Sequence, residues 1–128
     1  MAHRGPDNSI FVNDGNRCFG FHRLAINGLN SESNQPFFIK NCRLICNGEI
    51  YNHKELFQSI HTTPTTQSDC EIIIHLFIRY GIEQTLRMLD GVFSFVFFIL
   101  WWMEREIKII IKFYSVCLRL VDLWMYIV

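Results

Sequence analysis

The sequence has no excess of charge of either sign. Its 128 residues include 12 basic and 12 acidic side chains, so the formal net charge at pH 7 is zero. Without a basic surplus there is no general electrostatic attraction to nucleic acid or to anionic membrane surfaces. We therefore expect neither a nucleic acid nor a membrane among the partners of this protein.

Long uncharged apolar runs, metal-ligand spacing and a signal peptide are also lacking. The run Val92–Met103 is too short to span a membrane, and residues 109–128 contain Lys112, Arg119 and Asp122. The five cysteines are irregularly spaced, and Cys42 with Cys46 has no matching cysteine or histidine pair elsewhere. We expect reduced thiols, no metal, no cofactor in this chain and a cytoplasmic location.

The composition is that of a globular chain, with 50% hydrophobic residues and 12 phenylalanines. Short runs of β-forming residues separated by turn residues predict two hairpins, over residues 10–26 and 37–46. Lys40-Asn41 is the predicted turn of the second hairpin. A buried strand is predicted over Val92–Phe98.

Helical patterns occupy the segment between the hairpins and this last strand. Asn52 followed by Glu55, and Ser68 followed by Glu71, resemble capping boxes at two helix starts. The second helix is predicted to stop at Gly81. A third helix is predicted over Glu83–Leu89.

The pair Asn47-Gly48 is a strong turn signal, because both residues tolerate a left-handed backbone. It predicts a turn directly after the β-type run that ends at Cys46. The N–H of Gly48 and the side-chain amide of Asn47 are two donors that can point at one spot, as in an oxyanion hole. A plain hairpin turn is the alternative interpretation of the same two residues.

Five motifs occur in order along residues 3–98. They are H-R-G-P-D at 3–7, F-H-R-L-A-I at 21–26, N-G-E-I-Y-N at 47–52, S-D-C-E at 68–71 and L-D-G-V-F-S-F-V at 89–96. Together they resemble the glutaminase domain of glutamine-dependent asparagine synthetase, a class II glutamine amidotransferase of the N-terminal nucleophile hydrolase type. The resemblance implies an α+β fold, the four-layer αββα sandwich, incomplete at both ends.

In that family glutamine is hydrolysed to glutamate and ammonia, and a second domain uses the ammonia, with aspartate and ATP, to make asparagine. The resemblance implies that Arg23 binds the α-carboxylate of glutamine through its guanidinium fork. It implies that Glu49 and Asp69 bind the α-ammonium group. Taken singly, Arg23 also fits a sheet-surface charge, Asp69 a helix cap and Glu49 a solvated turn residue.

The same resemblance implies that the motif N-G-E-I-Y-N at 47–52 binds the amide end of glutamine. Asn47 and Gly48 would donate to the tetrahedral oxyanion. Leu24 and Ile26 would lie along the pocket, where backbone carbonyl groups help to hold the ammonium group. Glutamine is thus the implied small-molecule partner.

The sequence departs from the family pattern at its first residues. The family's nucleophile is a cysteine directly after the initiator methionine, whereas Ala2 follows Met1 here, and a methyl group cannot attack an amide. Cys70 at a helix start is the replacement to consider, because a helix N-terminus lowers a thiol pKa. It carries no free α-amine to act as base. We therefore expect no hydrolysis by this chain alone, and whether it is an enzyme stays open.

Residues 99–128 contain no Gly, Pro or Asn, and therefore no turn signal. We interpret residues 1–98 as a partial glutamine amidotransferase type 2 domain and residues 99–128 as a divergent apolar tail, a pattern typical of a reading-frame change or a fragment. There is no Ser-Gly-Gly-x-Asp-Ser nucleotide loop. The ATP and Mg sites of the family would then belong to a synthetase domain outside this chain.

Three hypotheses about function follow. The first is a truncated glutaminase domain of an asparagine synthetase that keeps much of the glutamine pocket and lacks the catalytic thiol; a synthetase domain on another chain is a further candidate partner. The second is a non-catalytic module that binds glutamine or a protein partner. The third is a non-functional truncated product.

Overall fold

The computed structural model of the chain describes residues 7–14, 17–23, 30–103, 106–109 and 112–115. In these ranges β1 and β2 form a two-stranded sheet, and β3, β4, β5 and β6 follow one another in a five-stranded sheet in which β7 also pairs with β5. The elements are β1 (Asn8–Asp14), β2 (Arg17–Arg23), η2 (Ser31–Ser33), β3 (Phe37–Ile39), β4 (Cys42–Ile50), α1 (His53–Ser59), η3 (Asp69–Glu71), α2 (Ile72–Met88), β5 (Gly91–Met103), β6 (Glu106–Ile109) and β7 (Lys112–Ser115).

Both predicted hairpins are present. In the first, β1 and β2 are antiparallel, with Ile10 opposite Phe21. In the second, β3 and β4 are antiparallel, with Phe37 opposite Leu44. The backbone of Lys40 has a φ of 53°, as expected for a residue in a tight turn. The predicted strand after residue 91 is also present and pairs with β4 along the whole length of β4.

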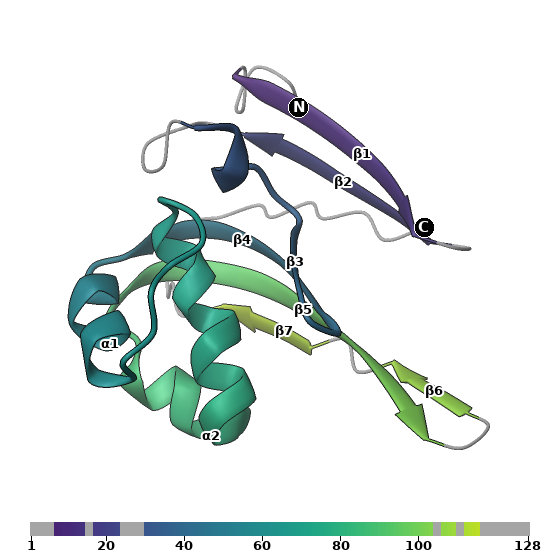
Figure 1. The fold of residues 1–128 in the computed structure, drawn as a ribbon. Coiled ribbons are helices and arrows are strands. Elements are labelled where there is room, and N and C mark those ends of the chain that lie inside the picture. The colour runs from purple at the N-terminus through teal and green to yellow at the C-terminus, as the bar shows by residue number, and fades with distance from the viewer. Residues whose placement is uncertain (1–6, 15–16, 24–29, 104–105, 110–111, 116–128) are drawn as a thin grey trace.

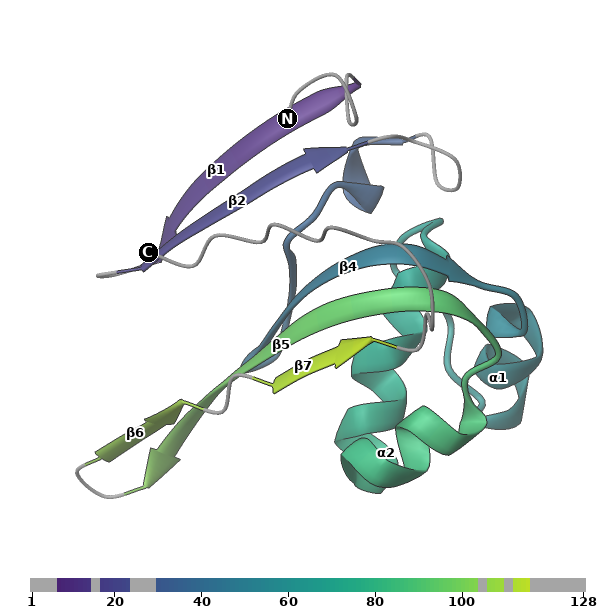
Figure 2. The same cartoon turned by 180° about the vertical axis from the view of Figure 1, so that it is seen from behind.

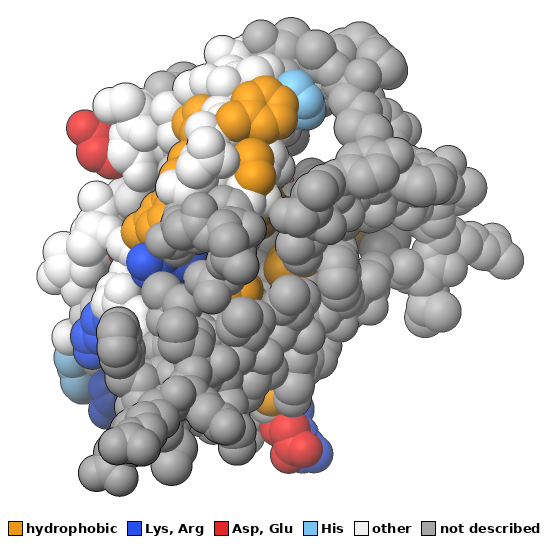
Figure 3. All heavy atoms as spheres, turned by 90° about the vertical axis from the view of Figure 1, so that its right-hand side faces the viewer, with side chains coloured by type: hydrophobic (Ala, Val, Ile, Leu, Met, Phe, Trp, Pro, Cys, Tyr) orange, Lys and Arg blue, Asp and Glu red, His pale blue; other side chains and the backbone are white. Residues whose placement is uncertain are grey.

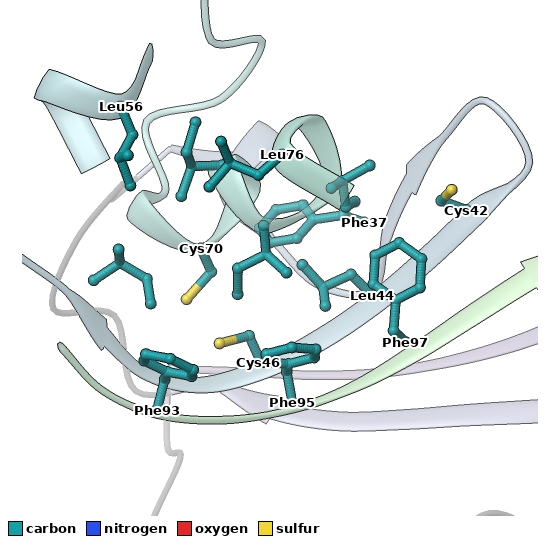
Figure 4. Close-up of a cluster of buried hydrophobic side chains, with 14 of the residues drawn as sticks. Phe37, Cys42, Leu44, Cys46, Leu56, Cys70, Leu76, Phe93, Phe95 and Phe97 are labelled. Carbon is teal, nitrogen blue, oxygen red and sulfur yellow. The ribbon is translucent and has the colours of Figure 1, made fainter. Parts of the chain in front are cut away.

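The main core lies between the helices and one face of the larger sheet. Side chains alternate along a strand, so every second residue of β4 and β5 faces the helices. The sheet residues of this core are Cys42, Leu44, Cys46, Ile50, Phe93, Phe95, Phe97 and Ile99. Figure 4 shows the sheet side chains packed against Leu56 and Leu76 of the helices.

A smaller core lies on the other face of the same sheet. It contains Ile45 of β4 and Phe98 of β5, which pack against Phe19 of β2. The rings of Phe19 and Phe98 meet edge to face, with centroids 5.8 Å apart. The β1-β2 hairpin therefore covers the face opposite the helices, as Figure 1 shows.

The described residues thus form a mixed α/β arrangement with antiparallel sheets, compatible with the expected α+β class. Three layers can be followed: the helices, the larger sheet and the β1-β2 hairpin (Figures 1 and 2). The second helical layer of the αββα sandwich is not among the described residues and stays a prediction.

The helices occur where they were predicted, and the predicted starts Asn52 and Ser68 are the N-cap residues of α1 and η3, but the hydrogen bonds of a capping box are absent. Neither Asn52 nor Ser68 makes a side-chain cap hydrogen bond. Asn52 instead donates to the carbonyl of Met88 at 2.9 Å and accepts from the N–H of Asp90 at 3.0 Å. Its side chain joins the start of α1 to the end of α2, a long-range contact that a local sequence pattern cannot show.

Gly81 interrupts α2 rather than ending it. Its φ of 75° and ψ of 176° are not helical, so two helical segments meet there at a kink. The prediction of a helix up to Gly81 and another over Glu83–Leu89 is therefore correct in substance. Only glycine adopts this backbone conformation without strain.

The predicted turn at Asn47-Gly48 is wrong. Both residues lie inside β4, where Asn47 pairs with Ser94 and Gly48 with Phe93. Gly48 has a φ of 138°, and a Cβ atom there would lie 2.1 Å from the carbonyl oxygen of Val92. The backbone freedom that marks a turn residue is used here for the close approach of β5.

The expectation that residues 99–128 contain no chain reversal is wrong for their described part. β5 continues to Met103, β6 pairs with it antiparallel over Leu100–Met103, and β7 pairs with it over Ser94–Phe97. β6 and β7 thus follow the edge of β5 that faces away from β4, and Figure 2 shows β7 beside β5. β-branched and aromatic residues favour strands, so this segment can form paired strands although it contains no Gly, Pro or Asn. Residues 116–128 lie outside the described residues.

Several large hydrophobic side chains remain exposed. Figure 3 shows hydrophobic side chains at the surface on one side of the molecule, next to Lys or Arg and His side chains. Phe11 is 69% exposed and meets the ring of His22 edge on. Phe38 is also exposed, and the guanidinium of Arg43 lies 4.5 Å from its ring centroid.

Substitution of Gly48 by alanine is expected to cost more than about 3 kcal/mol of unfolding free energy, because the methyl group meets backbone atoms of β5 and the residue has a positive φ. Gly20→Ala is the matched control, since its Cβ would meet only the ring of the exposed Phe11, at 3.1 Å. We expect it to cost less than about 1 kcal/mol. Urea unfolding of the two variants measures the difference, and equal losses would contradict this account.

Candidate functional site

Among the described residues, no strand lies beside one edge of β4 over its second half. β3 pairs with β4 only as far as Leu44, whereas β5 pairs with the other edge throughout. On the open edge two side chains accept backbone N–H groups. Gln35 Oε1 accepts from Cys46 at 2.6 Å, and Asp69 Oδ2 accepts from Ile50 at 2.6 Å. Gly48 lies midway between these two residues along β4.

Exposure along this edge is confined to three residues. Asn47, Gly48 and Glu49 are exposed, while the flanking Cys46 and Ile50 are only 1% and 0% exposed. The flanking residues anchor the strand in the core, and the three between them are open to a ligand. A backbone N–H in such a position is a suitable donor to an oxyanion.

Asp69 lies at the start of η3, is 3% exposed and contacts the backbone of β4. Ser68, not Asp69, is the N-cap residue of η3, and the carboxylate of Asp69 bonds to β4 instead. Its bond to Ile50 places a buried acidic side chain two residues from Gly48 on the same edge. The structure therefore brings together Asp69 and the central motif, which are far apart in sequence.

Arg23 is the last residue of β2 and is 8% exposed, so the interpretation of Arg23 as a sheet-surface charge is wrong. Its guanidinium Nη1 donates to Asn34 Oδ1 at 2.6 Å and to the carbonyl of Asn30 at 3.3 Å. These two bonds join Arg23 to the segment that leads into β3. Leu24 and Ile26, also expected at the pocket, lie outside the described residues.

Sequence reasoning missed the segment Asn30–Gln35, which lies between the two predicted hairpins. Three of its side chains bond to separate parts of the molecule: Asn34 to Arg23, Gln35 to Cys46, and Ser33 through its Oγ, which accepts from the N–H of Gln67 at 3.1 Å. No local signal marks these residues, because each partner is distant in sequence.

Sequence reasoning treated Glu71 only as a capping partner and missed its other hydrogen bonds. It is completely buried and accepts hydrogen bonds from the N–H and hydroxyl groups of both Thr65 and Thr66. It also bonds to His75 Nε2 at 2.9 Å. Burial raises the pKa of this carboxyl, but the hydrogen bonds from His75, Thr65 and Thr66 outweigh burial and lower the pKa from 4.5 to about 2. The ionised Glu71 thereby fixes the loop directly before Asp69.

Cys70 does not have the acidity of a reactive thiol. Its pKa is raised well above 9.0 by a hydrogen bond with Cys46, by burial, and by the nearby Cys46 and Asp69 groups. Figure 4 shows the two sulfur atoms pointing toward each other inside the core. The suggestion that the helix start makes Cys70 acidic is wrong, because burial and neighbouring groups dominate. Burial also raises the pKa of Cys42.

The described residues contain neither a metal-binding cluster nor a helix that could span a membrane. No group of three or more His, Cys, Asp and Glu side chains is arranged so that it could hold a metal ion. No helix in these ranges has the length and apolar character needed to cross a membrane.

Similarity to known proteins identifies the family of this chain. The sequence pattern of the glutamine amidotransferase domain family matches residues 1–112. Since the match covers most of the chain, the chain belongs to this family.

The particular relatives within the family are asparagine synthetases. The chain is 49% identical over 106 residues to the glutamine-hydrolysing asparagine synthetase of Homo sapiens, and 47% identical over 106 residues to that of Rattus norvegicus. It is 47% identical over 102 residues to the enzyme of Gallus gallus. Each match covers 75% of this chain and 18% of the relative, so the chain spans less than a fifth of the length of the relatives it matches.

The depressed pKa of Glu71 predicts a loss of stability in acid. The pKa of the Glu71 carboxyl is 4.5 in the unfolded chain and about 2 in the folded protein. Its contribution to the free energy of unfolding is therefore complete above pH 4.5 and disappears as the pH falls toward 2. The loss is about 3 kcal/mol. Urea unfolding between pH 6 and pH 2, in steps of about one unit, measures it.

Glu71→Gln keeps the shape of the side chain and removes its titration. This variant is expected to be less stable than the wild type at pH 7 and to lose less stability between pH 5 and pH 2. The neighbouring carboxyl of the exposed Glu55 serves as a control, since Glu55→Gln is expected to leave the wild-type pH dependence in place. Parallel pH profiles for wild type and Glu71→Gln would show that Glu71 does not titrate as described.

Proposed function

We propose that this chain binds glutamine at the open edge of β4, as the glutaminase domain of an asparagine synthetase does. The observation that carries the proposal is the 2.6 Å bond between Asp69 Oδ2 and the N–H of Ile50. It sets a buried carboxylate beside the exposed Asn47-Gly48-Glu49 segment. A buried anion next to exposed hydrogen-bond donors suits a ligand that carries an ammonium group and a polar amide.

The ends of the amino acid would be held by charges of opposite sign. Arg23 would pair with the α-carboxylate, since its planar guanidinium matches a carboxylate in a bidentate manner. Asp69 and Glu49 would bind the α-ammonium group. Asp69 Oδ2 is engaged by Ile50, which leaves the lone pairs of Oδ1 for a ligand.

The amide end of glutamine would lie against the β4 edge. Asn47 and Gly48 would donate to the carbonyl oxygen, and to the oxyanion when a nucleophile attacks. Leu24 and Ile26 are proposed to line the pocket between the two ends. The αββα sandwich would complete the domain around this site.

We further propose that this chain binds glutamine without hydrolysing it. The cysteines nearest the proposed site, Cys46 and Cys70, are both buried. The raised pKa of Cys70 keeps its thiol protonated at neutral pH. This favours a binding function over a self-sufficient glutaminase.

The relatives are asparagine synthetases that hydrolyse glutamine. We propose that the natural partner of this domain is a synthetase domain that consumes ammonia. ATP and Mg would be bound in that domain, and the assembly would act in the cytoplasm in amino-acid biosynthesis.

Glutamine is expected to give a measurable heat of binding with the 128-residue chain. Arg23→Ala should weaken binding by more than about 30-fold, because the loss of a charged partner at a buried site costs ~2–5 kcal/mol. Asp69→Asn keeps an oxygen for Ile50 but removes the negative charge, so it should weaken binding while the protein stays folded. Isothermal titration calorimetry measures both.

Lys40→Ala is the control for charge removal, since Lys40 lies exposed in the β3-β4 turn, and it should bind glutamine as the wild type does. Thermal unfolding of every variant shows whether the variant is folded, so that a missing heat of binding is not mistaken for loss of the fold. Equal affinities for wild type and Arg23→Ala would remove Arg23 from the site. No binding by the folded wild type would favour the non-functional alternative.

Ammonia release from glutamine by the same chain is expected to be indistinguishable from the uncatalysed background. An oxyanion hole without a nucleophile stabilises an intermediate that does not form. A coupled assay with glutamate dehydrogenase detects the ammonia. Turnover that disappears in Cys70→Ser would identify a replacement nucleophile, and turnover that survives replacement of all five cysteines would refute the account based on a thiol.

A further inference from the structure

Three consecutive residues, Ser33, Asn34 and Gln35, each bond to a different part of the proposed glutamine site. Asn34 Oδ1 accepts from Arg23 at 2.6 Å, and Gln35 Oε1 accepts from the N–H of Cys46 at 2.6 Å. Ser33 Oγ accepts from the N–H of Gln67, two residues before Asp69, at 3.1 Å. The three partners come from β2, from β4 and from the loop before η3.

Gln35 also determines where β4 becomes open. β3 begins at Phe37, which pairs with Leu44. The next N–H along that edge belongs to Cys46, and the buried side chain of Gln35 takes it in place of a further strand residue. The ladder therefore ends at Cys46, and Asn47 and Gly48 follow with no strand over them.

Asn34 acts at the other end of the proposed ligand. Its oxygen and the carbonyl of Asn30 hold the guanidinium Nη1 of Arg23, which fixes where the positive charge lies. Asn34 and Gln35 are joined by a single peptide unit, so the partners of their two side chains are connected through one short stretch of backbone. Arg23 and the backbone of Cys46 are linked in this way through two neighbouring residues.

We propose that the segment Ser33-Asn34-Gln35 is a positioning element that sets the distance between Arg23 and the donors Asn47 and Gly48. The proposal rests on the proposed function. The separation of the two ends selects an amino acid by length, so the element makes the site specific for glutamine over asparagine, which is one methylene shorter. A difference of one methylene changes binding by about 10–200-fold in a defined pocket.

The experiment compares the Kd values of glutamine and asparagine for the full chain. Wild type is expected to prefer glutamine by at least about 10-fold. Gln35→Met keeps the length of the side chain and removes the acceptor, and we expect its preference to fall to less than about 3-fold. Gln35→Glu restores the acceptor oxygen and should restore the preference. Asn34→Leu and Asn34→Asp form the corresponding pair at the other end.

Glu32→Ala is the matched control in the same turn, because Glu32 is exposed, and it should leave both Kd values unchanged. Wild-type preference retained in Gln35→Met and Asn34→Leu would overturn the positioning role while leaving the proposed function intact. Failure of folded wild type to bind either amino acid would overturn the proposed function, and this inference with it.

Amide hydrogen exchange gives a second measurement that needs no ligand. In Gln35→Met the amides of Cys46 and Asn47 should exchange at least about 10-fold faster than in wild type, since this part of β4 is no longer anchored. The amide of Ile50, held by Asp69, should keep its wild-type rate. Uniform acceleration at all three would indicate general destabilisation, and unchanged rates at Cys46 and Asn47 would overturn the inference.

Discussion

The N–H groups of Cys46 and Ile50 need hydrogen-bond partners on the edge of β4 where the described residues supply no strand beyond β3. Both residues are buried, and an unpaired buried N–H costs about 1–3 kcal/mol. Gln35 and Asp69 meet this requirement from two different segments of the chain. The same two bonds close the sheet at these points and leave the short stretch between them uncovered. The two hydrogen bonds that stabilise this part of the fold therefore also leave the edge of β4 accessible between them.

The position of Asp69 depends in turn on Glu71. A buried carboxylate is tolerated only when its oxygens are well supplied with hydrogen bonds, and Thr65, Thr66 and His75 supply them. These bonds order the loop that enters η3. Stability and site geometry are therefore coupled, because the charge on Glu71 that orders the loop also directs Asp69 toward β4.

Much of the fold could be predicted from the sequence because its signals are local. The hairpins, the helices and the break at Gly81 each follow from residues within a few positions of one another. The resemblance also identified Arg23 and Asp69, which the structure places in buried, bonded positions. The remaining errors concern partners far along the chain. Asn52 bonds to a residue 36 positions away, and Asp69 to one 19 positions away. For Gly48, tolerance of positive φ cannot distinguish a turn from a strand approached closely by its neighbour.

The thiols of Cys46 and Cys70 meet inside the core, one on β4 and the other on η3. An alkylating reagent can reach them only when these two elements separate, because neither sulfur is accessible in the closed state. Their rate of modification under native conditions thus reports how often the sheet and the η3 turn come apart. The labelling rate of the two cysteines therefore reports local opening where the open edge of β4 meets Asp69. A ligand that bridges β4 and η3 would slow the labelling of both cysteines.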